Sequence, residues 1–219
     1  FLFMVSILII VIVALPNLRL LLTSDIFGNT IAFSVDLGVI CLVLGIIQFV
    51  FTMSNISITA LSREGNSANY MKFIPIDFYK QFIYKSIPQI IINMFFSIII
   101  LILIKLIFVE FNFIYLFFIF IISNLLNIIN SELMVLVDFY KPNLKWKTEY
   151  ETVKNDNKLF QYVLTIFIIL ILVYFNKIFK DLNLNISCFL IILIFVLLIF
   201  IINKIIKINI NKLFEKINN

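Results

Sequence analysis

Few residues of this chain could carry out acid–base, nucleophilic or metal chemistry. Histidine is absent from all 219 residues, which removes the usual zinc ligand and the usual general base near neutral pH. Cys41 and Cys188 each lie within an apolar run, so we expect two separate thiols rather than a disulfide. Asp36, Asp138 and Asp181 lie at the ends of apolar runs, where they do not form facing pairs. The sequence therefore disfavours an intramembrane protease or lipid transferase, and we expect this chain to bind no metal or cofactor of its own.

The apolar residues form long runs. The chain is 63% hydrophobic and 13% charged, whereas a soluble domain is about half apolar and about a quarter charged. A bilayer core about 30 Å thick requires about 20 apolar residues in a helix. Six runs meet this requirement: 1–22, 37–61, 86–109, 111–135, 159–176 and 186–206. We predict an all-α, polytopic helical bundle, a single transmembrane domain over residues 1–219 with about six spans. Because Phe1 lies inside the first run, we expect the start of the protein to be missing.

The basic residues predict which ends of the spans face the cytoplasm. Of the 17 lysines and arginines, 13 lie in residues 62–85, in residues 136–158 or after residue 203, and four lie in the opposite connections. Lysine and arginine are enriched on the cytoplasmic side of a membrane. The two loops 62–85 and 136–158 and both ends of this segment are therefore expected in the cytoplasm. The net charge of +5 follows from this topology, so we expect no nucleic-acid partner.

The first of these loops is much longer than a connection between two spans requires. Asn66 or Ser67 could cap a short helix, and Pro75 would end it, because the residue before proline is pushed out of the helical region. Asp77 could then cap the next helix. The short helix would bear the apolar side chains Tyr70, Met71, Phe73 and Ile74. They could contact a partner protein, or they could form an interfacial elbow whose aromatic rings lie among the lipid headgroups.

Both loops resemble those of one family. The sequence Ser62-Arg63-Glu64-Gly65, then Met71 to Asp77, then Lys85 is similar to the segment after the second span of type 2 ATP-binding-cassette exporter permeases. In that family this segment is the coupling helix, which contacts the nucleotide-binding subunit. The resemblance implies that ATPase coupling involves Arg63, Glu64, Gly65, Tyr70, Met71, Phe73 and Pro75. If it does, Gly65 would form a turn, and Arg63 and Glu64 would pair with the ATPase or with each other across it. The segment from Asn66 to Phe73 replaces a more aromatic run of the family, so the docking surface is expected to differ in detail.

The second loop resembles that of a clostridial-type group of these permeases. The matched positions are Asp138, Pro142, Leu144, Trp146, Glu149, Glu151, Val153 and Lys154. The resemblance covers about residues 37–175 and suggests the C-terminal half of a longer permease, with about twelve spans in all. It implies a bacterial plasma-membrane protein whose partners are the bilayer, a cytosolic ABC ATPase, and a second permease half or a second copy.

Amide side chains recur at helical spacing within the predicted spans. They are Gln48, Asn55, Asn93, Asn124, Asn127 and Asn130. An unpaired amide in hydrocarbon costs several kcal/mol, so these side chains should face other helices or water. They could hold helices together, which we favour, or they could line a path for a substrate.

Three functions remain open from the sequence. The first is a permease subunit that exports an unknown substrate. The chain has no Gly-x-x-x-x-Gly-Lys-Ser/Thr phosphate loop and only four glycines, so ATP and Mg²⁺ would be bound by the partner subunit. The second is a channel or a membrane anchor, and a passive pore would not need the long first loop. The third, which we disfavour, is an intramembrane enzyme.

Overall fold

The structure is a computed structural model that describes residues 35–108, 111–148, 151 and 157–216. Over these residues it is helical, with no strand. The elements, in chain order, are α2 (Leu37–Phe51), the 3₁₀ segments η1 (Ser57–Thr59) and η2 (Ser62–Phe73), α3 (Phe78–Ile107), α4 (Phe113–Tyr140), α6 (Lys158–Phe179) and α7 (Leu184–Lys216). The predicted first span, residues 1–22, lies outside the described residues.

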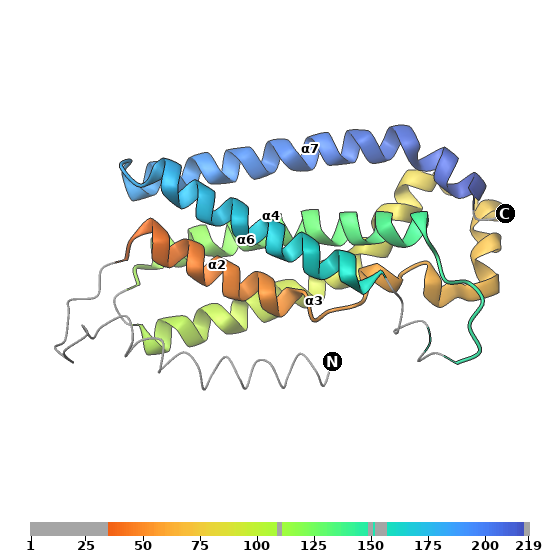
Figure 1. The fold of residues 1–219 in the computed structure, drawn as a ribbon, viewed down its shortest axis with the longest axis horizontal. Coiled ribbons are helices and arrows are strands. Elements are labelled where there is room, and N and C mark those ends of the chain that lie inside the picture. Colours follow the sequence, from red (N-terminus) through yellow and green to blue (C-terminus); the bar gives the residue numbers. More distant parts are fainter. Residues whose placement is uncertain (1–34, 109–110, 149–150, 152–156, 217–219) are drawn as a thin grey trace.

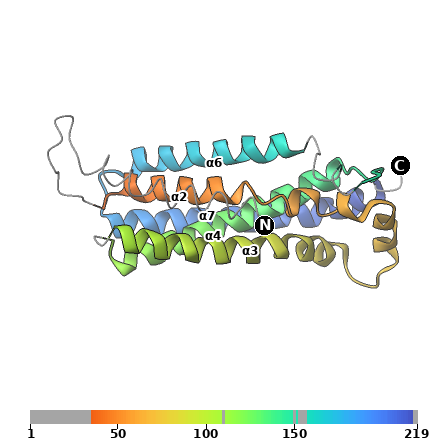
Figure 2. The ribbon, with the colours of Figure 1, turned by 90° about the horizontal axis from the view of Figure 1, so that it is seen from below.

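Four helices, α3, α4, α6 and α7, are long and apolar enough to cross a membrane. They run lengthwise along the molecule with α2 beside them, as Figures 1 and 2 show. These helices confirm the prediction of an all-α bundle with membrane-spanning helices. The bundle has a loop end, where η1, η2 and residues 141–148 lie, and a hairpin end, where α3 is followed by α4 and α6 by α7.

The predicted span 37–61 is shorter than expected, because α2 ends at Phe51. The residues directly after α2 include Thr52 and Ser54, whose hydroxyl groups bind the backbone of the helix. The Thr52 hydroxyl donates to the carbonyl oxygen of Gln48 over 2.9 Å, and the Ser54 hydroxyl donates to that of Phe51 over 2.9 Å. Side chains of this kind offer the backbone an alternative to continued helix. The 15-residue α2 is about 22 Å long, so the turn and η1 complete the path to the loop end.

Helices α3, α4 and α7 extend beyond their predicted spans at the loop end. Helix α3 starts at Phe78 rather than near residue 86, and α4 continues to Tyr140 rather than to about residue 135. Helix α7 continues through the basic tail to Lys216. With 30 residues, α3 is about 45 Å long, which exceeds the hydrocarbon core by about 15 Å.

Buried apolar side chains form two clusters. The larger lies among α2, α3, α4, α6 and α7. The smaller cluster is at the loop end, where Phe78 stacks on Phe214 with ring centroids 4.2 Å apart. It comprises Leu61, Ala68, Met71, Phe82, Val135, Phe139, Ile206, Ile210, Leu213 and Phe214. The helical tail of α7 thus packs against α3 and α4 and shares the smaller cluster with residues of η2.

Candidate functional site

The two loops meet at the carboxylate of Asp138. The sequence predicted this residue within a loop, but it lies in the last turns of α4 and is fully buried. The backbone N–H groups of Leu61 and Ser62 donate to its Oδ2 over 2.6 and 3.0 Å, and the Ser62 hydroxyl donates to its Oδ1. A carboxylate that accepts several hydrogen bonds at the start of a helical segment satisfies N–H groups that would otherwise be unpaired. Asp138 therefore fixes the start of η2 to α4.

Ser62 connects this contact to the second loop. Its hydroxyl oxygen accepts a hydrogen bond from the backbone N–H of Asn143 over 3.0 Å, and its carbonyl oxygen accepts one from Nε1 of Trp146 over 2.8 Å. Pro142 lies just before these residues and is half-buried. Asn143 and Trp146 of the second loop thus hold the first loop through Ser62.

Gly65 occupies the kink in η2. Its φ of 52° and ψ of −130° lie in a region that other residues rarely adopt. A β-carbon at this position would lie 3.1 Å from Nε1 of Trp146 and 3.2 and 3.3 Å from two further ring atoms. Gly65 is therefore required twice, for the backbone turn and for the approach of the indole, which agrees with the turn predicted from the sequence.

The charged residues beside Gly65 are paired within the protein. Glu64 forms an ion pair with Lys85 of α3, and Lys85 also donates to the carbonyl oxygen of Ala60 over 3.3 Å. The Arg63 guanidinium donates to the carbonyl oxygen of Ile56 and to Thr59. The sequence suggested a pair between Arg63 and Glu64 or contacts with a partner. Each side chain instead binds a neighbouring element and stiffens the segment.

The two faces of the second half of η2 differ. The prediction of Met71 as a partner contact is wrong, because its side chain is buried in the smaller core. Its carbonyl oxygen accepts a hydrogen bond from Nε2 of Gln81 over 3.1 Å. Tyr70 and Phe73 are 69% and 81% exposed. Ile74, Pro75 and Ile76, which follow η2, are also exposed. These five residues, Tyr70, Phe73, Ile74, Pro75 and Ile76, are called the apolar tip below.

Three further predicted residues of the second loop are Glu149, Glu151 and Lys154. The Glu151 carboxylate accepts a hydrogen bond from the backbone N–H of Lys147 over 2.9 Å, so it is engaged within its own loop. Glu149 and Lys154 lie outside the described residues.

The predicted intramembrane amides are mostly buried between helices. Asn93 of α3 donates to Oδ1 of Asn127 over 2.8 Å, and Asn127 donates to the carbonyl oxygen of Ile90 over 3.0 Å. Gln48 donates to the carbonyl oxygen of Ser123 over 3.4 Å. These bonds join α3 to α4 and α2 to α4, which is what helix–helix packing requires.

The remaining three amides lie in different settings. Asn124 is half-buried and donates to the carbonyl oxygen of Phe120 over 2.8 Å and to the Ser97 hydroxyl of α3 over 3.4 Å. Asn55 is half-buried in the turn between α2 and η1 rather than within a span. Asn130 is fully buried, and neither of its amide atoms has a partner within the described residues. Among these six amides, Asn130 is the one whose polar atoms are both left for water or a ligand.

Sequence reasoning missed Gln81 as a determinant of the site. Its Nε2 group donates to the carbonyl oxygens of Met71 and Ile76, the latter over 2.8 Å, so it holds both ends of the turn around Pro75. The signal is a glutamine one turn after Asp77, at the start of a helix that follows a proline.

Comparisons of this chain with protein-family models, with curated proteins and with solved structures found no match.

Proposed function

We propose that this protein is the permease subunit of an ATP-binding-cassette exporter, and that the apolar tip docks on a separate cytosolic ATPase. One observation carries the proposal. A segment fixed to α3, α4 and the second loop by hydrogen bonds and an ion pair ends in fully or partly exposed apolar side chains. A segment that transmits force from a partner must be held rigidly against its own helices. It must also expose side chains that the partner can contact. Aromatic anchors of this kind supply most of the binding energy at many interfaces.

The position of the tip along α3 favours docking over an interfacial elbow. Lys105 lies near the hairpin end of α3, and a hydrocarbon core of about 30 Å extends about 20 residues from it, to Lys85. Glu64 pairs with Lys85, whereas the Met71 carbonyl pairs with Gln81, one turn further out. Helix α3 begins at Phe78, seven residues from Lys85, so the end of the tip at Ile76 lies about 10 Å beyond the core edge. The headgroup layer is only about 5–8 Å thick, so the tip reaches water.

The mechanism follows from these contacts. ATP-driven closure of two ATPase subunits would move the tip and, through the Asp138 and Lys85 contacts, the loop ends of α3 and α4. Rigid helices packed in this way move as bodies and expose a path alternately to the two sides of the membrane. The protein would lie in a bacterial plasma membrane with the loop end in the cytoplasm, as its basic residues indicate.

A channel or a membrane anchor is the second candidate. The exposed apolar tip is the one observation that favours a membrane anchor, because an anchor also requires a surface on which its partner docks. The anchor predicts a partner that does not hydrolyse ATP, and a passive channel predicts none.

Co-purification tests the proposal. The tagged full chain is extracted from its own host in detergent, and bound proteins are identified and assayed for ATP hydrolysis. The proposal predicts a stoichiometric partner with a phosphate-loop motif, encoded beside this chain. It also predicts that Tyr70→Ala/Phe73→Ala leaves the amount of membrane-inserted protein unchanged and removes this partner. A partner without ATPase activity, or a double mutant that keeps its partner, contradicts the proposal.

A further inference from the structure

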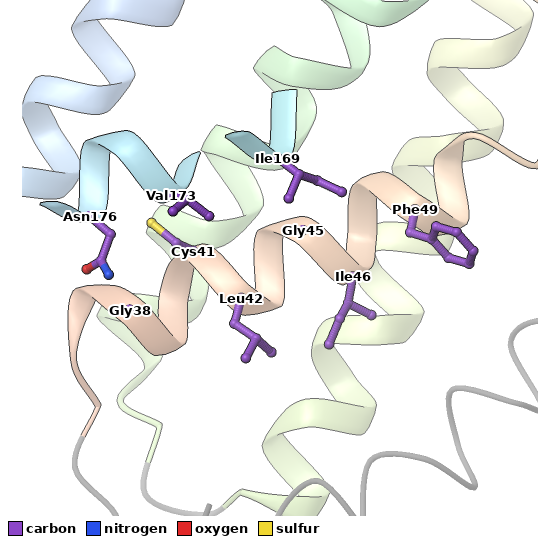
Figure 3. A pocket seen from close by; sticks show the side chains of 9 residues that line it. All are labelled: Gly38, Cys41, Leu42, Gly45, Ile46, Phe49, Ile169, Val173 and Asn176. Carbon is purple, nitrogen blue, oxygen red and sulfur yellow. The ribbon is translucent and has the colours of Figure 1, made fainter. Parts of the chain in front are cut away.

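A groove of about 510 Å³ lies between α2 and α6, away from the loops. Figure 3 shows the residues that line it, with Gly38 and Asn176 at one end and Phe49 at the other. The lining is almost entirely apolar: Gly38, Cys41, Leu42, Gly45, Ile46, Phe49, Ile169, Val173 and Asn176. The groove follows the length of α2, so in a membrane it runs across the hydrocarbon core.

Two glycines explain why the surface is hollow here. Gly38 and Gly45 are seven residues apart and therefore lie on one face of α2. A β-carbon on Gly45 would lie 3.9 Å from Ile169, in ordinary contact, so the backbone there is not crowded. Leu42 and Phe49 flank the groove and are 41% and 52% exposed, which leaves it open on one side.

A second hollow, of about 620 Å³, adjoins the groove at the hairpin end. Both are lined by Gly38 and Asn176, so one continues into the other. The second hollow is polar, and its lining residues are Val35, Asp36, Leu37, Gly38, Asn176, Lys180, Leu182, Asn183 and Leu184. Together they form a space that is apolar along its length and carries one cation, one anion and two amides at its mouth.

The side chain at the junction lacks a protein partner. The Asn176 amide has no hydrogen bond within the described residues, although it lies one turn inside the end of α6, and its Nδ2 is 3.4 Å from where a Gly38 β-carbon would lie. A polar group at the edge of hydrocarbon without a partner costs free energy. The amide is therefore available to a ligand that brings its own hydrogen-bonding groups.

We propose that the joined hollows bind one phospholipid through its phosphate, a property that goes beyond the proposed export function. An acyl chain lies in the groove, and the headgroup lies in the polar hollow. Lys180 contacts the phosphate, and Asn176 donates to the ester or phosphate oxygens. The lysine at the mouth complements the charge of a phosphate, and both volumes lie in the range of ligand pockets, about 300–1,000 Å³.

Blocking the groove tests the acyl-chain site. The full chain is purified in mild detergent, and bound phospholipid is counted by native mass spectrometry. Val173→Trp fills the groove and is expected to lower bound phosphatidylethanolamine about tenfold. Val163→Trp is the matched control, because Val163 is on the same helix, is similarly exposed at 63%, and does not line the groove. Equal lipid retention by the two variants overturns the proposal.

The headgroup site has its own matched pair. Lys180→Gln is expected to weaken phosphatidylethanolamine binding about tenfold, as loss of a charge-assisted contact does. Lys177→Gln, on the same helix but outside both hollows, should change it little. In wild-type protein, diacylglycerol, which lacks the phosphate, should not displace phosphatidylethanolamine. If both lysine variants behave alike, or if the two lipids compete equally, the assignment is wrong.

A photo-crosslinker identifies the occupant directly and does not depend on a variant that blocks the groove. A benzoylphenylalanine residue placed at Ile46, in otherwise wild-type full chain, should yield an adduct with the mass of one phospholipid. A crosslink within the chain to residues 1–22, or to a second copy, would mean that a helix occupies the groove and would overturn the proposal.

Discussion

The Trp146 indole covers Gly65 so closely that a β-carbon on the glycine would lie 3.1 Å from the ring nitrogen. The same nitrogen donates to the carbonyl oxygen of Ser62 over 2.8 Å. The two residues are 81 positions apart in the chain, yet their contact sets the conformation of η2. The apolar tip is held in place by this contact, by Asp138 and by the pair between Glu64 and Lys85.

Gly65→Ala should loosen the first loop. The positive φ and the nearby ring both oppose a methyl group, so we expect a loss of about 1–3 kcal/mol in the stability of this region. Trp146 is the only tryptophan of the chain, and its fluorescence should shift to the red and report earlier thermal loosening. Gly45→Ala is the matched control, because its β-carbon meets nothing closer than 3.9 Å. Identical melting curves for the two variants would refute the role of Gly65.

Asp138→Ala should release the start of η2 from α4. The substitution leaves the N–H groups of Leu61 and Ser62 without their acceptor, at a cost of about 1–3 kcal/mol for each buried group. Hydrogen exchange should accelerate at these two amides, and Asp138→Asn should give an intermediate effect because it keeps one acceptor oxygen. Asp181→Ala, at the hairpin end, serves as control. Unchanged protection of both amides in Asp138→Ala would show that the carboxylate does not hold the segment.

The sequence predicted the membrane helices well, because hydrophobic length is a local property. It overestimated the span from 37 to 61, since hydroxyl groups at Thr52 and Ser54 end α2 by hydrogen bonds that composition does not reveal. It underestimated α3 and α4, whose extra turns are stabilised by the smaller core. That core depends on packing against the tail of α7, a contact between distant segments.

The candidate site was only partly predictable. The turn at Gly65 and the contribution of Trp146 follow from residue types that favour such positions. The burial of Met71 could not be predicted, because it depends on which face of a short 3₁₀ segment meets α3. The partners of Arg63 and Glu64 were missed for a similar reason, since each binds an element that the fold brings beside it.

Asn127→Leu should weaken the packing of α3 on α4. It removes hydrogen bonds with Asn93 and with the Ile90 carbonyl, each worth about 0.6–1.7 kcal/mol in a membrane. Asn93→Leu should cost less, and the double mutant should cost less than the sum, because the two side chains share a bond. Thermal unfolding in detergent measures these losses. If Asn127→Leu abolished transport while stability stayed unchanged, the amides would line a path instead.

Thiol labelling tests the orientation. In a background with Cys41 and Cys188 replaced by alanine, cysteines at Asn66, Asn143 or Asn211 should be protected from an impermeant reagent in intact cells. A cysteine at Asn183, which is exposed at the hairpin end, should react. Labelling of Asn66 or Asn143 from outside would reverse the topology and with it the proposed docking to a cytosolic protein.

The most direct test of the central claim compares two neighbouring positions of η2. In the cysteine-free background, Phe73→Cys places a thiol on the apolar tip, and Met71→Cys places one in the smaller core, two residues away. We predict that a short bifunctional crosslinker joins Phe73→Cys to the partner ATPase in native membranes and that ATP changes the yield, whereas Met71→Cys gives no product. Crosslinking of neither residue to the ATPase, with Phe73→Cys modified instead by a reactive lipid probe, would contradict the account and support an interfacial elbow.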